Sequence, residues 1–414
     1  MEARLDQAAA PASGQRGAER APAGRIDQID SLRALAMTAV IAEHCHILPF
    51  GWMGVWLFFV ISGFVVTTSL LSRPINETSS TRLTQFYTRR AARIWPIYLA
   101  YVTIGFVASA LAVHYFNWPA FVSFVLFYNN FQLAFADGLF KAFPVGHLWT
   151  ISVEFQFYIV FGLAFTFLSR RALTGLLLVF LVLSPVLRFI GGEWLHAAGY
   201  TPLKAAFAIY SFSPMHFDSF AAGALLALGR ERWARASGAR ALLIAGLGVM
   251  IAYIGVYVGV NHAHGATGVR MLRNIISGIL YGDFRQVWLY SAVALLSAGL
   301  IATILAGKAA WVGFTRNGLL QAIGRVSYGG YVYHALCVRW VGELMRLVIP
   351  PATTMASKLE FGAAQFAVAL SATIAVALLS YHWVEQPIIL AVGRRLAPPK
   401  VSLGRRDPLP DGAA

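Results

Sequence analysis

Long runs of apolar residues, each close to the length that crosses a lipid bilayer, recur along the whole chain. A transmembrane α-helix needs about 20 consecutive, mostly apolar residues, because it rises about 1.5 Å per residue through about 30 Å of hydrocarbon. The composition agrees, since 58% of the residues are hydrophobic and only 12% are charged, whereas soluble domains carry about 25% charged residues. The sequence therefore predicts an all-α polytopic membrane protein.

We expect a bundle of about ten transmembrane helices. Their approximate boundaries are 31–48, 52–71, 94–113, 148–168, 172–190, 206–228, 240–260, 288–306, 322–346 and 364–391. The apolar stretch 118–135 is shorter, so a re-entrant or surface segment is expected there. No tandem or inverted repeat is visible, which slightly disfavours a secondary carrier.

If the N-terminus is cytoplasmic, cytoplasmic and external segments alternate along the chain. Most of the lysines and arginines then fall in the cytoplasmic segments. Because cytoplasmic loops carry an excess of Lys and Arg, we expect both termini in the cytoplasm. This distribution accounts for the formal net charge of +15 without nucleic acid as a partner. One external connection is also basic, with Arg270, Arg273 and Arg285. Either this connection faces an acidic acceptor molecule, or its arginines were simply tolerated when the connection was translocated across the membrane. The second explanation is the commoner case.

One transmembrane domain, residues 29–396, is expected to make up most of the chain. Residues 1–28 are polar and lack an apolar core, so we expect a disordered cytoplasmic tail and not a signal peptide. Residues 397–414 are basic and rich in proline, and a second disordered cytoplasmic tail is expected there. Cys45 and Cys337 offer neither a disulfide framework nor the spacing of metal ligands, so no metal is expected.

The first expected span carries four ionisable residues, Arg33, Glu43, His44 and His46. Such residues are costly inside a membrane and usually functional. At about 100° per residue, Arg33 and His44 differ by about 20° in azimuth and by about 16 Å along the helix axis. His46 points about 200° away from His44. Helical phase therefore selects His44 as the histidine on the face of Arg33, for which a snorkelling anchor is the alternative reading.

Two further sets of polar residues lie on single helix faces. Arg90 and Arg93 are spaced i,i+3, and two forked guanidiniums suit a phosphate group; a positive-inside anchor is the alternative. His147, Glu154 and Tyr158 share a face of the fourth span. A buried Glu154 has to be paired or protonated, and it either orients a base or binds a substrate hydroxyl.

The second span contains Ser62 and Gly63, a pair that predicts a close approach between helices. Ser62 lacks the strand–turn–helix context of a nucleophile elbow. Asp218 beside His216, His334 after Tyr331, and the pair Tyr381 and Glu385 are individually weak candidates, because polar and aromatic residues commonly anchor helix ends at the interface. Together with the stronger sets, they predict a buried polar chamber.

The order of these motifs resembles the acyltransferase-3 family of integral membrane O-acyltransferases. The likeness runs from about Ile29 to Pro387, and six motifs in order make it specific. Members of the family usually move an acetyl group from cytoplasmic acetyl-CoA to sugar hydroxyls of surface or exported glycans, and some acylate antibiotics or peptidoglycan. The motifs are Arg33 and His44 separated by ten residues, GVWLFFVISGF, RRAARIWPIY, HLWTISVEFQFY, SYGGYVYH and a closing YHWVEQP.

The resemblance implies a role for each matching residue. His44 matches the essential histidine of the family and Arg33 the arginine of the same motif, while Arg90 and Arg93 match the pair thought to hold the CoA phosphates. Glu154 matches the glutamate of the fourth-span motif. His334 and Glu385 match family positions in the last motifs of the series. Two departures are Phe155, where a polar residue is common, and His216, where an arginine is common.

Acyl transfer to a hydroxyl requires removal of its proton and stabilisation of the developing oxyanion. Imidazole, with an ordinary pKa near 6.5, suits the first task. We therefore expect His44 to be the general base, with Glu43 or Glu154 as its partner, and Arg33 to contact the pantetheine or a phosphate. A relay through an acetylated histidine is the competing mechanism.

We thus predict an enzyme of a bacterial inner membrane that uses acetyl-CoA, or another acyl-CoA, to acylate a hydroxyl of a surface or exported glycan. Alternatives are a transporter or flippase of a glycan or lipid-linked sugar, a membrane scaffold without chemistry, and an acyltransferase for a small metabolite. Polar residues expected to contact substrate or to support the structure are His147, Tyr158, Asp218, His334, Tyr381 and Glu385.

Overall fold

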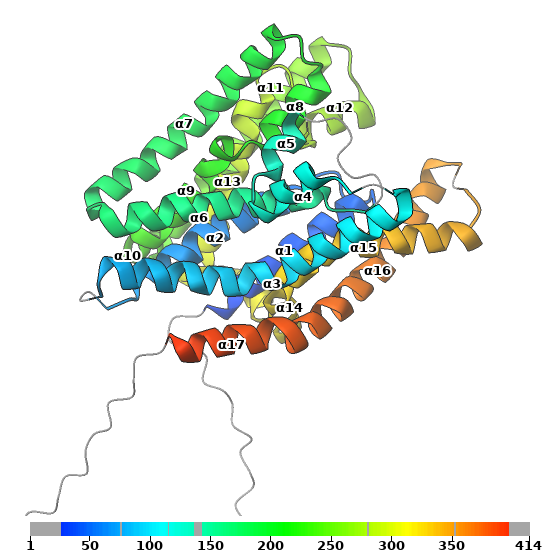
Figure 1. Ribbon diagram of the computed structural model, residues 1–414. Helices are drawn as coiled ribbons and strands as arrows, with labels where there is room; N and C mark the ends of the chain where they lie inside the picture. Colours follow the sequence, from blue (N-terminus) through cyan, green and yellow to red (C-terminus); the bar gives the residue numbers. More distant parts are fainter. Residues whose placement is uncertain are drawn as a thin grey trace, which may run out of the picture.

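The computed structural model describes residues 26–396 except 75, 76, 115, 136–142, 280 and 352. The expected tails, 1–28 and 397–414, lie outside the described residues apart from 26–28. Within the described ranges every regular element is a helix and none is a strand (Figure 1). The all-α prediction is confirmed.

Seven helices of the described part are long and apolar enough to cross a membrane. The last of them continues from α16 through the π-helix η4 (Tyr381–Glu385) into α17 (Gln386–Arg395). By this criterion the chain is a multi-pass membrane protein. The seven are α2 (Met53–Leu71), α3 (Ser79–Val113), α6 (Trp149–Phe167), α7 (Arg170–Ala197), α11 (Ala236–Ala263), α13 (Arg285–Ala306) and α16 (Met355–Ser380).

Three expected spans coincide with helices that are too short or too polar to meet the criterion of length and apolar character. They are α1 (Asp27–His44), α9 (Phe217–Leu228), which follows α8 (Pro202–Ser211), and α15 (Ser327–Val348). Charged residues in α1 and α15, and the 12-residue length of α9, set them apart. All three nevertheless pack among the long helices, α1 and α9 against α2 and α15 against α16.

Short helices connect the long ones. The stretch 118–135 forms α4 (Trp118–Val125) and α5 (Asn129–Phe135), neither of which is long enough to cross a bilayer. The remaining short elements are η1 (Gly146–Leu148), η2 (Ser213–His216), α10 (Arg230–Trp233), α12 (Gly268–Ile276), η3 (Ala310–Arg316) and α14 (Gly318–Arg325).

Small residues allow α2 and α9 to touch backbone to backbone. A Cβ atom on Gly63 would lie 2.0 Å from the carbonyl oxygen of Phe220, and one on Gly223 would lie 1.9 Å from that of Val60. No side chain larger than hydrogen fits at either position, because real Cβ contacts are never that short. The predicted close approach at Ser62 and Gly63 is confirmed.

The helices that carry most of the predicted site run alongside one another. α1 and α15 are parallel, since Arg33 contacts Ser327 near one end and His44 contacts His334 towards the other. α16 is antiparallel to α15, because Gly329 approaches Ala377 whereas Gly342 approaches Gln365. In Figure 1, α3, α15 and α16 occupy the lower part of the view, and α7 and α11 the upper part.

Candidate active site

The first cavity, which we call the arginine pocket, lies where α1, α2, α3, α6 and α15 meet. It contains about 870 Å³ of empty space, including its open mouth. Its charged lining residues are Arg33, Arg90, Arg93 and Glu154, and hydroxyl groups come from Ser62, Thr150, Tyr158, Ser327, Tyr328 and Tyr331. The three arginines predicted to act on the donor are therefore brought together by the fold.

The guanidinium groups of this pocket are only partly satisfied by the protein. Arg33 Nε donates to Ser327 Oγ at 3.1 Å. The guanidinium carbon of Arg90 lies 5.8 Å from the centre of the Tyr158 ring, a cation–π contact. The Nε atom of Arg90 is buried and has no hydrogen-bond partner. What distinguishes this pocket is that three guanidinium groups line one cavity, which suits an anionic ligand.

Three carboxylates accompany the three arginines. Glu154 accepts hydrogen bonds from the hydroxyls of Ser62 and Tyr158. Glu385, which is only 4% exposed, interacts electrostatically with Arg93 and Arg33. Asp30 also interacts electrostatically with Arg33, so the three positive charges are matched by three carboxylates.

Glu385 reaches this end of the bundle from the π-helix η4. Its Oε1 would lie 2.9 Å from a Cβ atom on Gly329, so the glycine makes room for the carboxylate. Tyr381, at the start of the same π-helix, is half-buried and contacts the His382 ring, and it lines neither cavity described in this section. The two residues predicted to act as an i,i+4 pair thus have different surroundings, as a π-helical turn changes the azimuth that α-helical spacing implies.

Three histidines from separate elements meet between α1, η1 and α15. The ring centres of His44 and His334 are 5.1 Å apart, and those of His334 and His147 are 4.7 Å apart. His147 Nε2 lies 3.1 Å from the carbonyl oxygen of Val332, and His334 Nδ1 lies 2.6 Å from that of Tyr331. Since a carbonyl oxygen only accepts, both of these nitrogens carry hydrogen. His147 Nδ1 and His334 Nε2 are then lone-pair nitrogens, and both are buried without a partner.

His44 also faces a second cavity, which we call the basic pocket. It lies where α1 and α15 end and α16 begins, and it contains about 1320 Å³ of empty space, including its open part. Its cationic side chains are Arg339, Arg346 and Lys358, and His44 and His46 line it as well. His44 is exposed to this cavity. The donor-binding candidates and His44 therefore lie at opposite ends of α1.

His46 does not follow the helical phase assumed for it. α1 ends at His44, and His46 has a backbone φ of 62°, so its side chain turns into the same cavity as that of His44. The expected direction of His46, about 200° from that of His44, assumed that the helix continues to His46, whereas the 100° rule ends with the helix at His44. His44 is still the one of the two in ring contact with His334.

A pair of hydroxyl groups separates the arginine pocket from the histidines. Thr150 Oγ1 donates to the hydroxyl of Tyr331 at 2.8 Å, and that hydroxyl lies 3.3 Å from the carbonyl oxygen of His147. Thr150 and Tyr331 both line the arginine pocket. The wall of this pocket is thus also the support of the histidine cluster.

The two carboxylates expected to partner His44 lie elsewhere. The carboxyl group of Glu43 is hydrogen-bonded to the backbone of Trp52, and Glu154 bonds Ser62 and Tyr158 in the arginine pocket. Within the described residues no hydrogen bond or ion pair joins either one to His44. Glu43 is adjacent in sequence, but successive residues of a helix point about 100° apart. The ring next to His44 is that of His334.

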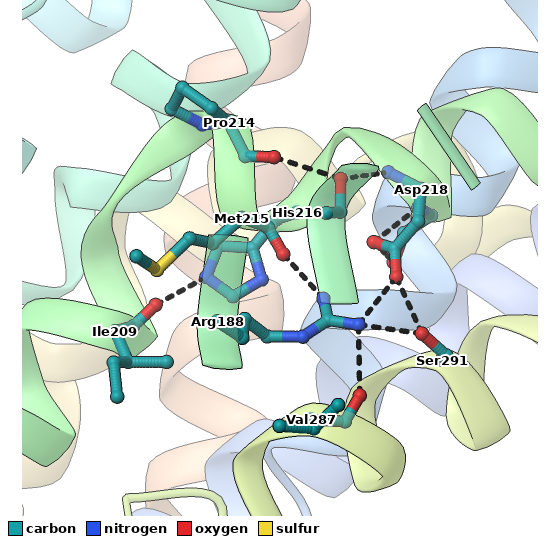
Figure 2. A network of polar contacts seen from close by, with 10 residues as sticks. Arg188, Ile209, Pro214, Met215, His216, Asp218, Val287 and Ser291 are labelled. Carbon is teal, nitrogen blue, oxygen red and sulfur yellow. Dashed lines mark hydrogen bonds and ion pairs between the residues drawn. The ribbon is translucent and has the colours of Figure 1, made fainter. Parts of the chain in front are cut away.

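Asp218 belongs to a buried ion pair away from both cavities (Figure 2). Arg188 Nη2 donates to its carboxylate at 2.9 Å, to Ser291 Oγ at 2.6 Å and to the carbonyl oxygen of Val287 at 3.2 Å, while Nη1 donates to the carbonyl oxygen of Met215. This network links α7, η2, α9 and α13. Sequence reasoning overlooked Arg188, although a single arginine inside an apolar stretch was a usable signal.

His216 lies in the same region. Its Nε2 is 2.9 Å from the carbonyl oxygen of Ile209, and Figure 2 shows it beside Arg188. The guanidinium of Arg188, which belongs to α7, thus lies near His216, the position at which the resemblance leads us to expect an arginine. In the part of the chain that the structure describes, no group of three or more His, Cys, Asp or Glu residues is arranged to hold a metal ion.

Comparison with known proteins adds independent information. A family model described as an acyltransferase domain matches residues 26–382. An uncharacterized protein of Haemophilus influenzae is 31% identical over 182 residues, which are 42% of this chain and 73% of that protein. O-acetyltransferase OatA of Staphylococcus aureus is 32% identical over 161 residues, or 34% of this chain and 25% of that protein.

Peptidoglycan O-acetyltransferase OatA of Listeria monocytogenes is 32% identical over 148 residues, which are 33% of this chain and 23% of that protein. The chain therefore matches about a quarter of the length of each of these OatA proteins. No solved structure matches. Because the family model covers most of the chain, from the start of α1 to η4, this multi-pass membrane protein belongs to the acyltransferase family.

Proposed function

We propose that the protein is a membrane O-acyltransferase of a bacterial inner membrane that transfers an acetyl group from cytoplasmic acetyl-CoA to a hydroxyl of a surface or exported glycan. One observation carries this proposal. The cluster of His44, His147 and His334 lies between a pocket lined by three arginines and a second pocket to which His44 is exposed. Such an arrangement suits a donor in one pocket and an acceptor in the other, which approach the imidazole of His44 from opposite sides.

The arginine pocket is the proposed donor site. Arg33, Arg90 and Arg93 supply three guanidiniums, and guanidinium–phosphate hydrogen bonds are charge-assisted and strong. The cavity volume of about 120 Å³ is smaller than the range of about 300–1,000 Å³ common for small-molecule sites, so most of a CoA molecule would lie in the open mouth.

The thioester end of the donor has to extend along α1. Arg33 and His44 are eleven residues apart, a rise of about 16 Å, and the pocket wall formed by Thr150 and Tyr331 lies next to the histidines. We propose that the phosphates of CoA bind the arginines and that the pantetheine arm passes this wall towards His44. Binding at the phosphates then positions a distant reacting group.

His44 is the proposed general base. It takes the proton of the acceptor hydroxyl while the hydroxyl oxygen attacks the thioester carbonyl carbon. The carbon–sulfur bond then breaks, the imidazolium protonates the departing thiolate, and an ester and free CoA are formed. His334 replaces Glu43 and Glu154 as the proposed positioning residue, because its ring is in contact with that of His44.

A relay through an acetylated His44 would use the same imidazole. The two mechanisms differ in the order of events, since a relay releases CoA before any acceptor is bound. Rapid mixing of the enzyme with acetyl-CoA alone separates them. A burst of CoA equal to the enzyme concentration indicates the relay, and its absence indicates direct transfer.

We further propose ten membrane crossings with both termini in the cytoplasm. The packing of α1, α9 and α15 among the seven apolar helices supports their insertion, and the distribution of Lys and Arg supports the orientation. In this orientation the start of α1, and with it the arginine pocket, faces the source of acetyl-CoA. Cysteine labelling from either side of sealed vesicles tests it.

The function is tested with the purified full chain in lipid nanodiscs, [acetyl-¹⁴C]acetyl-CoA and glycan fractions from the host envelope. We expect covalent label in a glycan fraction with the wild type and none with His44→Ala. A flippase moves its cargo unchanged, so an unlabelled glycan that nevertheless crosses the bilayer of reconstituted vesicles would contradict the proposal. The matched control is His46→Ala, which alters the same cavity without removing the contact to His334.

A further inference from the structure

The basic pocket contains cations that the proposed reaction does not use. Arg339, Arg346 and Lys358 line it together with His44. Proton removal from a hydroxyl by His44 requires none of them, and all three lie at the far end of α15 and α16 from the arginines assigned to CoA. Their presence beside the proposed base calls for a separate explanation.

Helical spacing directs these side chains into the cavity. On α15, Arg339, Gly342 and Arg346 are spaced i, i+3 and i+7, so they share one face. On α16, Lys358, Gly362 and Gln365 are spaced i, i+4 and i+7 and also share a face. All six residues line the basic pocket, so two helix faces form its opposite walls.

The pocket has an excess of positive charge. None of its lining residues is acidic. The carboxylate of Glu343 pairs with Arg339 at 2.9 Å, whereas neither Arg346 nor Lys358 has an acidic partner among the described residues. Glu360 is nearby in sequence but is exposed and does not line the pocket. Two positive charges are therefore available to a ligand.

The floor of the pocket is formed by close backbone contacts. A Cβ atom on Gly362 would lie 2.6 Å from the carbonyl oxygen of Cys45, and one on Gly342 would lie 2.5 Å from Gln365 Nε2. Gln365 Nε2 in turn donates to the carbonyl oxygen of Val338 at 2.9 Å. The same position above Gly342 is 3.9 Å from Arg346 Nη2, so this exposed guanidinium bends back towards the wall of the pocket.

The basic connection around α12 provides a contrast. Arg270 donates to the carbonyl oxygen of Gly265 at 2.8 Å, and Arg285 donates to those of Asn274 and Gly282 at 2.5 and 3.2 Å. These two arginines hold their own loop together. Of the three arginines in this connection, Arg273 alone is then left for the alternative in which the connection faces an acidic acceptor, whereas two cations without an acidic partner line the basic pocket.

We propose that the basic pocket binds the acceptor through a carboxylate or phosphate group, so that the acceptor is an anionic glycan. This inference rests on the proposed function, because it assumes that the acceptor meets His44 from this side. Arg346 and Lys358 hold the anionic group by charge-assisted hydrogen bonds, and the positive field draws acidic glycans to the pocket. The cavity volume of about 610 Å³ lies within the range of about 300–1,000 Å³ common for small-molecule sites.

The experiment compares two probes on the full chain in nanodiscs of zwitterionic lipid. One probe is a fluorescent tetrasaccharide that contains glucuronate, and the other is its carboxyl-reduced, neutral counterpart. We expect the wild type to bind the acidic probe at least about tenfold more tightly than the neutral one, since hydrogen bonds to charged groups contribute about 1.5–3 kcal/mol each. Arg346→Gln/Lys358→Gln should abolish this difference and leave the affinity for acetyl-CoA unchanged.

The matched control is Arg273→Gln, which removes an exposed cation outside the pocket and should keep the preference for the acidic probe. Equal binding of both probes to the wild type, or an equal loss in the control, overturns the inference. Anionic phospholipid that copurifies with the wild type but not with the double variant, without a preference for the acidic probe, assigns the cations to a lipid headgroup and also overturns it. Failure of acetyl-CoA to bind or turn over contradicts the proposed function instead, so the two failures are distinguishable.

Discussion

Arg90 and Arg188 both place a guanidinium group among apolar helices, yet their surroundings differ. Arg188 is fully buried, forms an ion pair with Asp218, and donates to Ser291 and to two carbonyl oxygens as well. Arg90 instead lines an open pocket and contacts the face of Tyr158. The Nε atom is buried without a partner in both arginines, so the difference between them lies in the ion pair of Arg188 and the cavity beside Arg90. A cation whose terminal nitrogens are engaged by the protein supports the fold, whereas one left partly unpaired beside a cavity is available to a ligand.

The same difference separates two regions of the molecule. Both pockets and the histidine cluster are built from α1, α2, α3, η1, α6, α15 and α16, whereas the network of Arg188 links α7, η2, α9 and α13. Substitutions in the first region should change kinetic parameters with little change in stability. Substitutions in the network of Arg188 should lower the stability with little change in the kinetic parameters.

The largest kinetic effect is expected from His44→Ala. Removal of a general base typically costs about 10²–10⁴-fold in rate, and the melting temperature should stay near that of the wild type because the side chain is exposed to a pocket. Initial rates of acetyl transfer together with thermal unfolding in detergent measure both quantities. His46→Ala should retain most of the activity, and a similar loss in both variants would contradict the assignment of the base.

The largest effect on stability is expected from Arg188→Met. It leaves the buried Asp218 charge unpaired, which typically costs about 3–5 kcal/mol in the free energy of unfolding. Unfolding in mixed micelles, followed by circular dichroism, measures this change. The double variant Arg188→Met/Asp218→Leu should recover much of the stability, and a failure to recover would show that the charge balance is not what matters there.

A smaller, purely kinetic effect is expected from Arg90→Gln. Loss of charge-assisted hydrogen bonds to a phosphate, worth about 1.5–3 kcal/mol, should raise the KM for acetyl-CoA about 10–100-fold while the KM for the acceptor stays unchanged. Arg89→Gln is the matched control, since Arg89 is exposed and does not line the pocket. A lower melting temperature without a change in KM would assign Arg90 to the same class as Arg188.

The smallest effect is expected from Tyr158→Phe, which keeps the ring beneath Arg90 and removes the hydroxyl that donates to Glu154. A single hydrogen bond contributes about 0.5–1.5 kcal/mol, so the KM for acetyl-CoA should rise about 2–10-fold. Tyr87→Phe serves as the control because the hydroxyl of Tyr87 bonds the backbone of Ile159 outside the pocket. An effect as large as that of Arg90→Gln would place the hydroxyl itself on the donor.

The amino-acid sequence alone determined the class of the protein. Apolar runs of fixed length predict membrane helices, because hydropathy and helix rise are local properties. Local spacing also placed Arg33 and His44 on one face of the first helix and paired Arg90 with Arg93 on another. The order of the motifs indicated the acyltransferase family, which the match over residues 26–382 confirmed.

Contacts between distant segments were decided only by the tertiary structure. His44 and His334 are 290 positions apart, and helical phase fixes the direction of each side chain within its own helix but not which helix faces it. For the same reason Arg188 was not linked to Asp218, and Glu154 was expected beside His44 although it lines the arginine pocket. The division into two pockets at opposite ends of α1 follows from how α1, α15 and α16 pack, because no single helix contains both walls of either cavity.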